Sequence, residues 1–202
     1  MKRDGLFSLI RSDIVLKQNW FLHNDSWFNR NIRVFLEPGT IAVIVYRYGC
    51  WASKLPVPVL RHILLLPYLL CKIVVVMGFG IFIPTSFKCG RGFAIHNFTG
   101  IFLPPRVTVG DNFIVFQGVT VGYLRGSNGS RAPRIGSNVL LGAGAKVLGD
   151  VTVGDNVVVG ANSLVISNVP DNCSVVGVPA RIVSRGENGW MLEKAQARGN
   201  HW

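Results

Sequence analysis

The sequence predicts an all-β solenoid, a parallel β-helix, preceded by an α-helical segment, and a six-residue repeat is the main reason. Residues 135–170 read IGSNVL, LGAGAK, VLGDVT, VGDNVV, VGANSL and VISNVP, so an aliphatic residue opens every hexad. A period of six fits neither an amphipathic helix nor a hairpin strand. It is typical of a parallel β-helix, in which each hexad supplies one short strand and one bend.

The residues before the repeat predict helices. We expect a short helix over residues 6–17, a break at Pro38-Gly39 and a second helix over residues 41–51. These segments mix charged and aromatic residues and carry no motif to which a reaction can be assigned. Residues 1–80 are therefore predicted to form a mainly helical, hydrophobic N-terminal segment.

Residues 57–83 are the most apolar stretch of the chain. About 20 apolar residues suffice to span a bilayer. Lys72 would lie near the bilayer centre, however, and Pro67 would interrupt the helix. We therefore favour helices that cap the open end of the solenoid or lie at a membrane surface, and a true span remains the alternative.

The repeat begins upstream of the regular array, because four residues from Ile83 to Ile101 also stand six positions apart. We assign residues 81–183 to the β-helix and residues 184–202 to a C-terminal tail. The array is interrupted at residues 122–134, GYLRGSNGSRAPR, which are rich in Gly, Ser and Arg. A loop that projects from a regular scaffold often carries functional residues, so we expect this loop to lie near a substrate.

Composition limits the possible partners and the compartment. The chain has 21 Lys and Arg against 10 Asp and Glu, which favours phosphorylated cofactors or anionic lipid as partners. No nucleic-acid-binding motif occurs, so nucleic acid is not expected. The four cysteines form no CxxC pair and have no histidine at zinc-ligand spacing, so we expect neither a disulfide framework nor a bound metal.

The first residues, MKRDGLFSLIRSD, lack the apolar run of a signal peptide. This predicts a cytoplasmic protein, and peripheral contact with the inner face of the membrane is left open. Anionic lipid head groups could meet the basic residues of the helical segment, although a solvated basic face would account for them equally well.

Several phrases of the repeat are similar to those of hexapeptide-repeat acyltransferases: VLLGAGAKVLGD, VGDNVVVG, VPDN and GVPAR. More narrowly, GRGFAIHNFTGIF, FQGVTVGY and SRAPRIG resemble the serine acetyltransferase branch and its polysaccharide-modifying relatives. The resemblance covers residues 83–183 closely. It implies a left-handed β-helix, a homotrimer with active sites between neighbouring prisms, and acetyl-CoA as the acyl donor.

The resemblance also suggests a general base. Members of this branch carry a catalytic histidine in an LDHATG segment, and the matching segment here is IHNFTG. The family histidine falls on Asn97 and its acidic neighbour falls on His96. An imidazole that titrates near neutrality suits proton removal from an attacking hydroxyl, so His96 is the candidate base; a histidine that only bonds the backbone at a coil corner is the alternative. No G-x-S-x-G motif occurs, which favours direct transfer over a covalent acyl-enzyme.

The choice of acceptor rests on departures from the family pattern. The phrase SRAPRI keeps Arg131 but has Ala132 where serine acetyltransferases carry histidine. A zwitterionic acceptor needs partners for both of its charges. We therefore predict a saccharide acceptor, from a capsule, an exopolysaccharide or a lipid-linked glycan, held near Asn97, Gln117 and Arg131. The alternatives are a serine O-acetyltransferase of cysteine biosynthesis and a non-catalytic hexapeptide scaffold.

For the donor, the resemblance points to small residues in two consecutive turns and to two cations. Gly and Ala let the pantetheine arm of CoA lie close to the backbone, although coil corners also favour Gly for backbone reasons alone. The two cations match positions from which related enzymes contact the CoA phosphates. The predicted cofactor-binding residues are Gly142, Ala143, Lys146, Gly160, Ala161 and Arg181.

Overall fold

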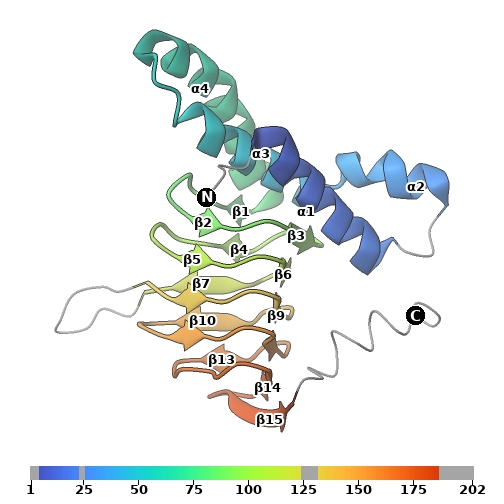
Figure 1. The fold of residues 1–202 in the computed structure, drawn as a ribbon, viewed down its shortest axis with the longest axis vertical. Coiled ribbons are helices and arrows are strands. Elements are labelled where there is room, and N and C mark those ends of the chain that lie inside the picture. The colour runs from blue at the N-terminus through green and yellow to red at the C-terminus, as the bar shows by residue number, and fades with distance from the viewer. Residues whose placement is uncertain (1–4, 23–25, 124–131, 187–202) are drawn as a thin grey trace.

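The computed structural model is a stack of three-sided coils with helices at its N-terminal end (Figure 1). The structure describes residues 5–22, 26–123 and 132–186. Three sheets form the sides of the prism, and all strand pairs within them are parallel except the last pair, β14 with β15. The predicted parallel solenoid with N-terminal helices is therefore confirmed.

Each of the first four coils contributes one short strand to each sheet, and the last coil contributes strands to the first and third sheets only. The first sheet contains β1 (Ile81–Phe82), β4 (Ile101–Phe102), β7 (Thr120–Gly122), β10 (Lys146–Leu148) and β13 (Leu164–Val165). The second contains β2 (Lys88–Cys89), β5 (Thr108–Val109), β8 (Arg134–Ile135) and β11 (Thr152–Val153). The third contains β3 (Phe93–His96), β6 (Phe113–Phe116), β9 (Val139–Leu141), β12 (Val158–Val159), β14 (Cys173–Val176) and β15 (Arg181–Arg185).

The aliphatic residues of the hexads fill the interior of the prism. In the third sheet Ile95, Val115, Leu141 and Val159 stack directly above one another and are fully buried. Burial of this kind stabilises the fold by about 25 cal/mol for each Å² of apolar surface removed from water. Successive coils thus share one continuous hydrophobic core, as the period of six predicts.

An asparagine ladder fixes one corner of the coils. Asn112, Asn138, Asn156 and Asn172 all have φ near +56°, a left-handed conformation that asparagine tolerates better than most residues. Each side-chain amide donates to the oxygen of the next asparagine, over 2.8 to 2.9 Å. The asparagine that recurs in the repeat is therefore explained by the backbone turn and needs no ligand.

The projecting loop leaves the prism between the first and second sheets. Gly122 ends β7 and Arg134 begins β8, in agreement with the predicted limits of the excursion. Thr120 nevertheless pairs in register with Lys146, so the coils continue undisturbed across the loop. Arg131 lies outside the described residues.

The helices are longer than the sequence predicts. The helical elements are α1 (Leu6–Phe21), α2 (Trp27–Asn31), the short 3-10 helix η1 (Arg33–Leu36), α3 (Pro38–Ala52), α4 (Pro58–Ile73) and its π-helical continuation η2 (Val74–Gly78). The predicted break at Pro38-Gly39 is wrong. Pro38 begins α3, because proline at the first helical position loses no hydrogen bond and has a suitable φ.

Helices α1 and α3 cover the first coil (Figure 1), and α4 packs on α3. The hydroxyl of Tyr46 donates to the carbonyl of Phe87 over 2.9 Å. A Cβ atom at Gly39 would lie 2.6 Å from the carbonyl oxygen of Ile95, so only glycine allows α3 to approach this closely. The helical cap is therefore fitted to the prism through specific contacts.

Candidate active site

Four of the predicted site residues lie in one column at the corner between the third and first sheets. Asn97, Gln117, Ala143 and Ala161 each follow a strand of the third sheet in successive coils. The carbonyl of Gln117 accepts from the amide of Gly144, and the carbonyl of Ala143 accepts from that of Asn162, each over 2.8 Å. Stacked strands lie about 4.8 Å apart, so this corner column is a narrow strip that runs parallel to the prism axis.

The top of the corner column is polar. The side-chain amide of Asn97 donates to the side-chain oxygen of Gln117 over 3.1 Å, and both groups reach the surface. The structure therefore brings these two predicted acceptor residues together. Each retains hydrogen-bonding capacity for a hydroxyl, a carboxylate or an ammonium group.

The small residues lower in the column have a packing role in this chain. A Cβ atom at Gly142 would lie 2.7 Å from the amide nitrogen of Ala161, and one at Gly160 would lie 2.7 Å from a methyl group of Val176. The clash at Gly142 is with backbone, so this glycine is required by the stacking of the coils, whereas the clash at Gly160 is with a side chain. Their presence is compatible with a cofactor lying against the backbone, but it does not depend on one.

The two predicted phosphate-binding cations lie on strands of two different sheets, Lys146 on the first sheet and Arg181 at the start of β15 in the third. Lys146 is on β10 and pairs in register with Leu164 of β13. The carbonyl of Leu164 accepts in turn from the amide of Ala180, over 2.7 Å, which places Arg181 in the next layer. Both charged side chains are exposed, and their hydrogen bonds go to nearby backbone carbonyls, of Gly144 and Ala180 respectively. This edge of the prism is accessible to an anion.

His96 immediately precedes the corner column, on the outer face of the third sheet. Its ring stacks on Phe21 at the end of α1, with centroids 3.9 Å apart and planes inclined by 6°, and it meets the edge of Phe116 at 5.2 Å. Among the described residues, neither ring nitrogen has a hydrogen-bond partner. The backbone bond that would make His96 purely structural is therefore not seen in this part of the chain.

The surroundings of His96 favour the neutral imidazole. Partial burial lowers its pKa below the ordinary 6.5, and the nearby ammonium of Lys17 lowers it further, while Glu37 partly opposes both effects. Lys17 is itself held in place, because its ammonium lies 2.5 Å from the carboxylate of Glu37 and donates to the carbonyl of Ile95 over 2.9 Å. At neutral pH, His96 can therefore accept a proton.

Sequence patterns did not indicate the groups that surround His96. Phe21, Lys17 and Glu37 lie more than fifty positions away in the chain, within helical segments that have no motif. Apolar residues four positions apart in α1, such as Leu16 and Trp20, indicate only that one face of this helix is buried. In the described part of the chain, no group of three or more His, Cys, Asp or Glu residues could hold a metal ion.

Comparison with known sequences finds similarity to hexapeptide transferases. The sequence model of the family "Bacterial transferase hexapeptide (six repeats)" matches residues 132–167. The serine acetyltransferase of Synechococcus elongatus is 36% identical over 148 residues, which cover 73% of this chain and 58% of that protein. The serine acetyltransferase of Staphylococcus aureus is 43% identical over 106 residues, which cover 52% of this chain and 50% of that protein. The chain thus spans about half the length of the curated relatives it matches.

Solved structures of serine acetyltransferases also superpose on this chain. Serine acetyltransferase from Vibrio cholerae superposes with a TM-score of 0.74 at 27% identity, covering 90% of this chain and 67% of that one. Serine acetyltransferase from Brucella abortus in complex with coenzyme A superposes with a TM-score of 0.73 at 29% identity, covering 88% of this chain and 67% of that one.

These comparisons confirm the resemblance to hexapeptide-repeat acyltransferases of the serine acetyltransferase type and correct the predicted acceptor. The saccharide prediction is wrong, because the relatives at 36 to 43% identity are serine acetyltransferases. The saccharide prediction took two substitutions, at residues 96 and 132, as the loss of an amino-acid site. Partners for the charges of an amino acid can come from several elements of a fold, so two positions do not decide the acceptor.

Proposed function

We propose that this hexapeptide-repeat transferase is an acetyl-CoA-dependent serine O-acetyltransferase. The observation that carries the proposal is the agreement of sequence and structure: the relatives found by sequence and the solved structures that superpose on this chain are both serine acetyltransferases. A related structure contains coenzyme A and another contains serine, which supports these compounds as donor product and acceptor.

We further propose a left-handed prism that assembles as a homotrimer. Both features come from the resemblance to the family. The corner column supports this assembly, because in a single chain its polar groups and the exposed cations Lys146 and Arg181 lie on an open edge. A second prism packed beside this edge would convert it into a cleft and exclude water from the reaction.

The reaction requires that one proton be removed from the serine hydroxyl and that one proton be given to the CoA sulfur. The serine hydroxyl attacks the thioester carbonyl of acetyl-CoA as a base removes its proton; the tetrahedral intermediate then collapses to O-acetylserine, and the CoA sulfur leaves and takes up a proton. We assign the base to His96, whose neutral imidazole adjoins the corner column. Asn97 and Gln117 are placed to orient the acceptor.

The proposed function is tested by thiol release. Incubation of the full chain with acetyl-CoA and L-serine is expected to release free CoA at a rate that saturates with serine, whereas glycine, which lacks the hydroxyl, is expected to give only the background rate. Mass spectrometry should identify O-acetylserine as the second product. Saturable release with a panel of sugars, and none with serine, would contradict the proposal.

The two exposed cations are expected to bind the phosphates of CoA. Lys146→Ala and Arg181→Ala should each raise KM for acetyl-CoA about ten- to a hundredfold, which corresponds to the roughly 1.5–3 kcal/mol of one charged hydrogen bond, with little change in kcat. Arg185→Ala is the matched control, because Arg185 lies on the same strand as Arg181 and is also exposed. An unchanged KM in both variants would exclude this edge of the prism as the phosphate site.

A further inference from the structure

We infer that the outward face of α4 and η2 binds the surface of an anionic lipid bilayer. This face is defined by the exposed apolar residues of the two elements, and the inference is independent of the proposed function. The residues of the α4 face are Val59, Leu60, Ile63, Leu66, Leu69, Leu70, Ile73, Val74 and Met77.

The α4 face is too apolar to be an ordinary protein surface. Residues 58–78 form one helix long and apolar enough to cross a membrane by length and composition, yet only 11% of its most apolar window is buried inside the molecule. Leu66 is 62% exposed, Leu70 67% and Met77 83%. Contiguous exposed apolar surface on this scale marks an interaction site. Figure 1 shows that α4 projects beyond the end of the prism, where a large flat partner can reach it.

The charged residues of this helix lie on its other side. Tyr68 and Val75 are buried, and the half-buried Arg61 and Lys72 lie in the same helical stripe, which faces the rest of the protein. The ammonium of Lys72 lies 5.7 Å from the ring centroid of Tyr68 and 5.8 Å from that of Phe82. A bilayer that contacts the outward face therefore does not have to bury Lys72, so the objection that this lysine raises against membrane contact does not apply.

Charge identifies the kind of bilayer. The sequence contains no Asp or Glu between Glu37 and Asp111, whereas seven Lys and Arg occur there. The two carboxylates of the described helical region are already engaged, Asp13 with Arg47 and Glu37 with Lys17. Within the described ranges, Lys54, Arg61 and Lys72 thus form no ion pair with a carboxylate. The long side chains of lysine and arginine can reach the head-group layer while their stems pack against the protein, and basic residues beside an apolar helix are typical of proteins that bind anionic head groups.

The same charge distribution disfavours a second copy of the chain as the occupant. Two copies that met through their α4 faces would bring two basic ends together, and the chain carries a formal net charge of +11. Exposed aromatic rings of α2, Trp27 and Phe28, add to the apolar surface at the helical end of the molecule. Tryptophan is enriched where proteins meet the membrane interface, which agrees with lipid as the partner.

The inference is tested by co-sedimentation of the full chain with vesicles. We expect binding to phosphatidylcholine vesicles that contain phosphatidylglycerol, weaker binding to phosphatidylcholine alone, and a decrease as salt is raised. Leu66→Glu combined with Leu70→Glu should reduce the partition coefficient about tenfold or more, because each carboxylate would enter the apolar layer. Ile166→Glu is the matched control: Ile166 is 48% exposed on the prism, and this variant should bind as the parent does.

A second pair of variants tests the charges separately and keeps the inference falsifiable if the glutamate variant does not fold. Lys54→Gln combined with Arg61→Gln should weaken binding to the anionic vesicles several-fold and leave binding to phosphatidylcholine unchanged. Failure of the parent chain to sediment with anionic vesicles would overturn the inference. So would unchanged vesicle binding by the Leu66→Glu, Leu70→Glu variant together with a smaller oligomeric mass in light scattering, since the α4 face would then cover a second copy.

Discussion

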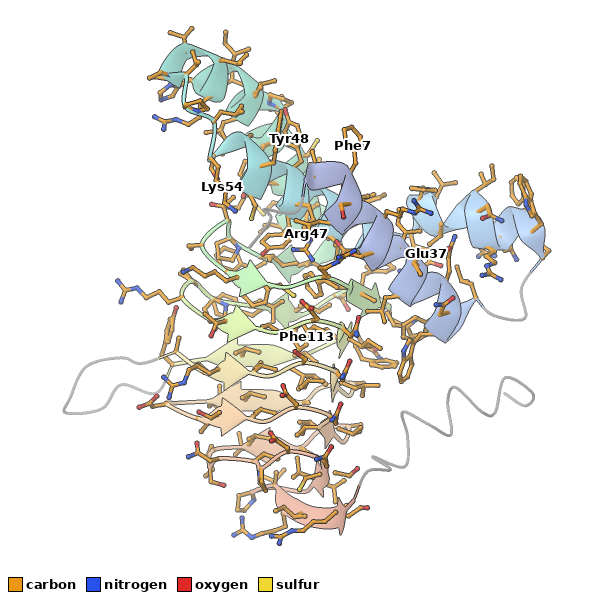
Figure 2. All side chains as sticks on the ribbon, viewed as in Figure 1. Phe7, Glu37, Arg47, Tyr48, Lys54 and Phe113 are labelled. Atoms are coloured by element: carbon orange, nitrogen blue, oxygen red, sulfur yellow. The ribbon has the colours of Figure 1, made fainter. Side chains whose placement is uncertain are left out.

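Replacing Asp13 by alanine is expected to lower the free energy of unfolding by about 3–5 kcal/mol, the usual effect of removing one partner from a buried ion pair. Asp13 and Arg47 are almost fully buried, and Figure 2 shows Arg47 where the helices meet the first coil. The guanidinium donates two hydrogen bonds to the carboxylate, of 2.8 and 2.9 Å. The amide of Phe93 donates to the same carboxylate over 2.7 Å. The variant leaves the buried guanidinium without a carboxylate, with only the carbonyls of Cys89 and Gly90 as acceptors, and leaves the buried amide of Phe93 without its partner.

The control for this prediction is Asp155→Ala. Asp155 also accepts a backbone hydrogen bond, from Ser137 over 2.6 Å, but it is exposed. Water can replace its carboxylate, so we expect Asp155→Ala to lower the free energy of unfolding by less than about 1.5 kcal/mol. Urea unfolding followed by circular dichroism measures both variants. Equal losses would show that the backbone hydrogen bond, and not the buried pair, accounts for the effect of Asp13→Ala.

The fold was predictable because its repeat is local. Every hexad contains its own aliphatic core residue, and the asparagines that take the left-handed conformation recur in the sequence with the turns that they form. The column of Asn97, Gln117, Ala143 and Ala161 follows from the same period. Once the repeat is recognised, a residue's position along the chain gives its sheet and its coil.

The contacts between the helices and the prism were not predictable in this way. Asp13 and Arg47 lie in helices that have no repeat, and their pairing depends on how α1 and α3 are placed over the first coil. The stacking of Phe21 on His96 joins the end of α1 to the end of β3. Sequence patterns identify His96 but do not identify the residues that pack around it. These residues lower its pKa.

The sequence also left the role of the apolar segment undecided for a physical reason. Composition shows how apolar a helix is. What the helix binds depends on which of its faces is already packed against the protein and which is left exposed. Lys72 counts against membrane contact when the helix is treated as uniform, and Arg61 is the other Lys or Arg of this helix. Their position in the stripe that faces the protein reverses this conclusion, because the outward face then carries no Lys, Arg, Asp or Glu.

Replacing His96 by phenylalanine is expected to lower kcat/KM for serine by about 100- to 10,000-fold, the usual contribution of a general base. Phenylalanine keeps an aromatic ring against Phe21 and Phe116, so the contact between α1 and the third sheet is retained. The melting temperature should therefore change little, and acetyl-CoA should still bind in calorimetry. Wild-type activity in this variant would exclude His96 as the base and direct the search to another residue of the corner column.

The pH dependence separates a catalytic from a structural role of His96. A base must be neutral to accept a proton, and both partial burial and the charge of Lys17 lower the pKa of His96 below 6.5. The rate should therefore be level above neutrality and fall as pH decreases through this lowered pKa. Folding stability should fall over the same acidic range, because the unfolded chain takes up the proton more readily.

Glu37→Gln removes a charge that raises the pKa of His96, so the acid limb of kcat/KM should move to lower pH. A purely structural His96 would leave that limb where it is while the stability profile still moved.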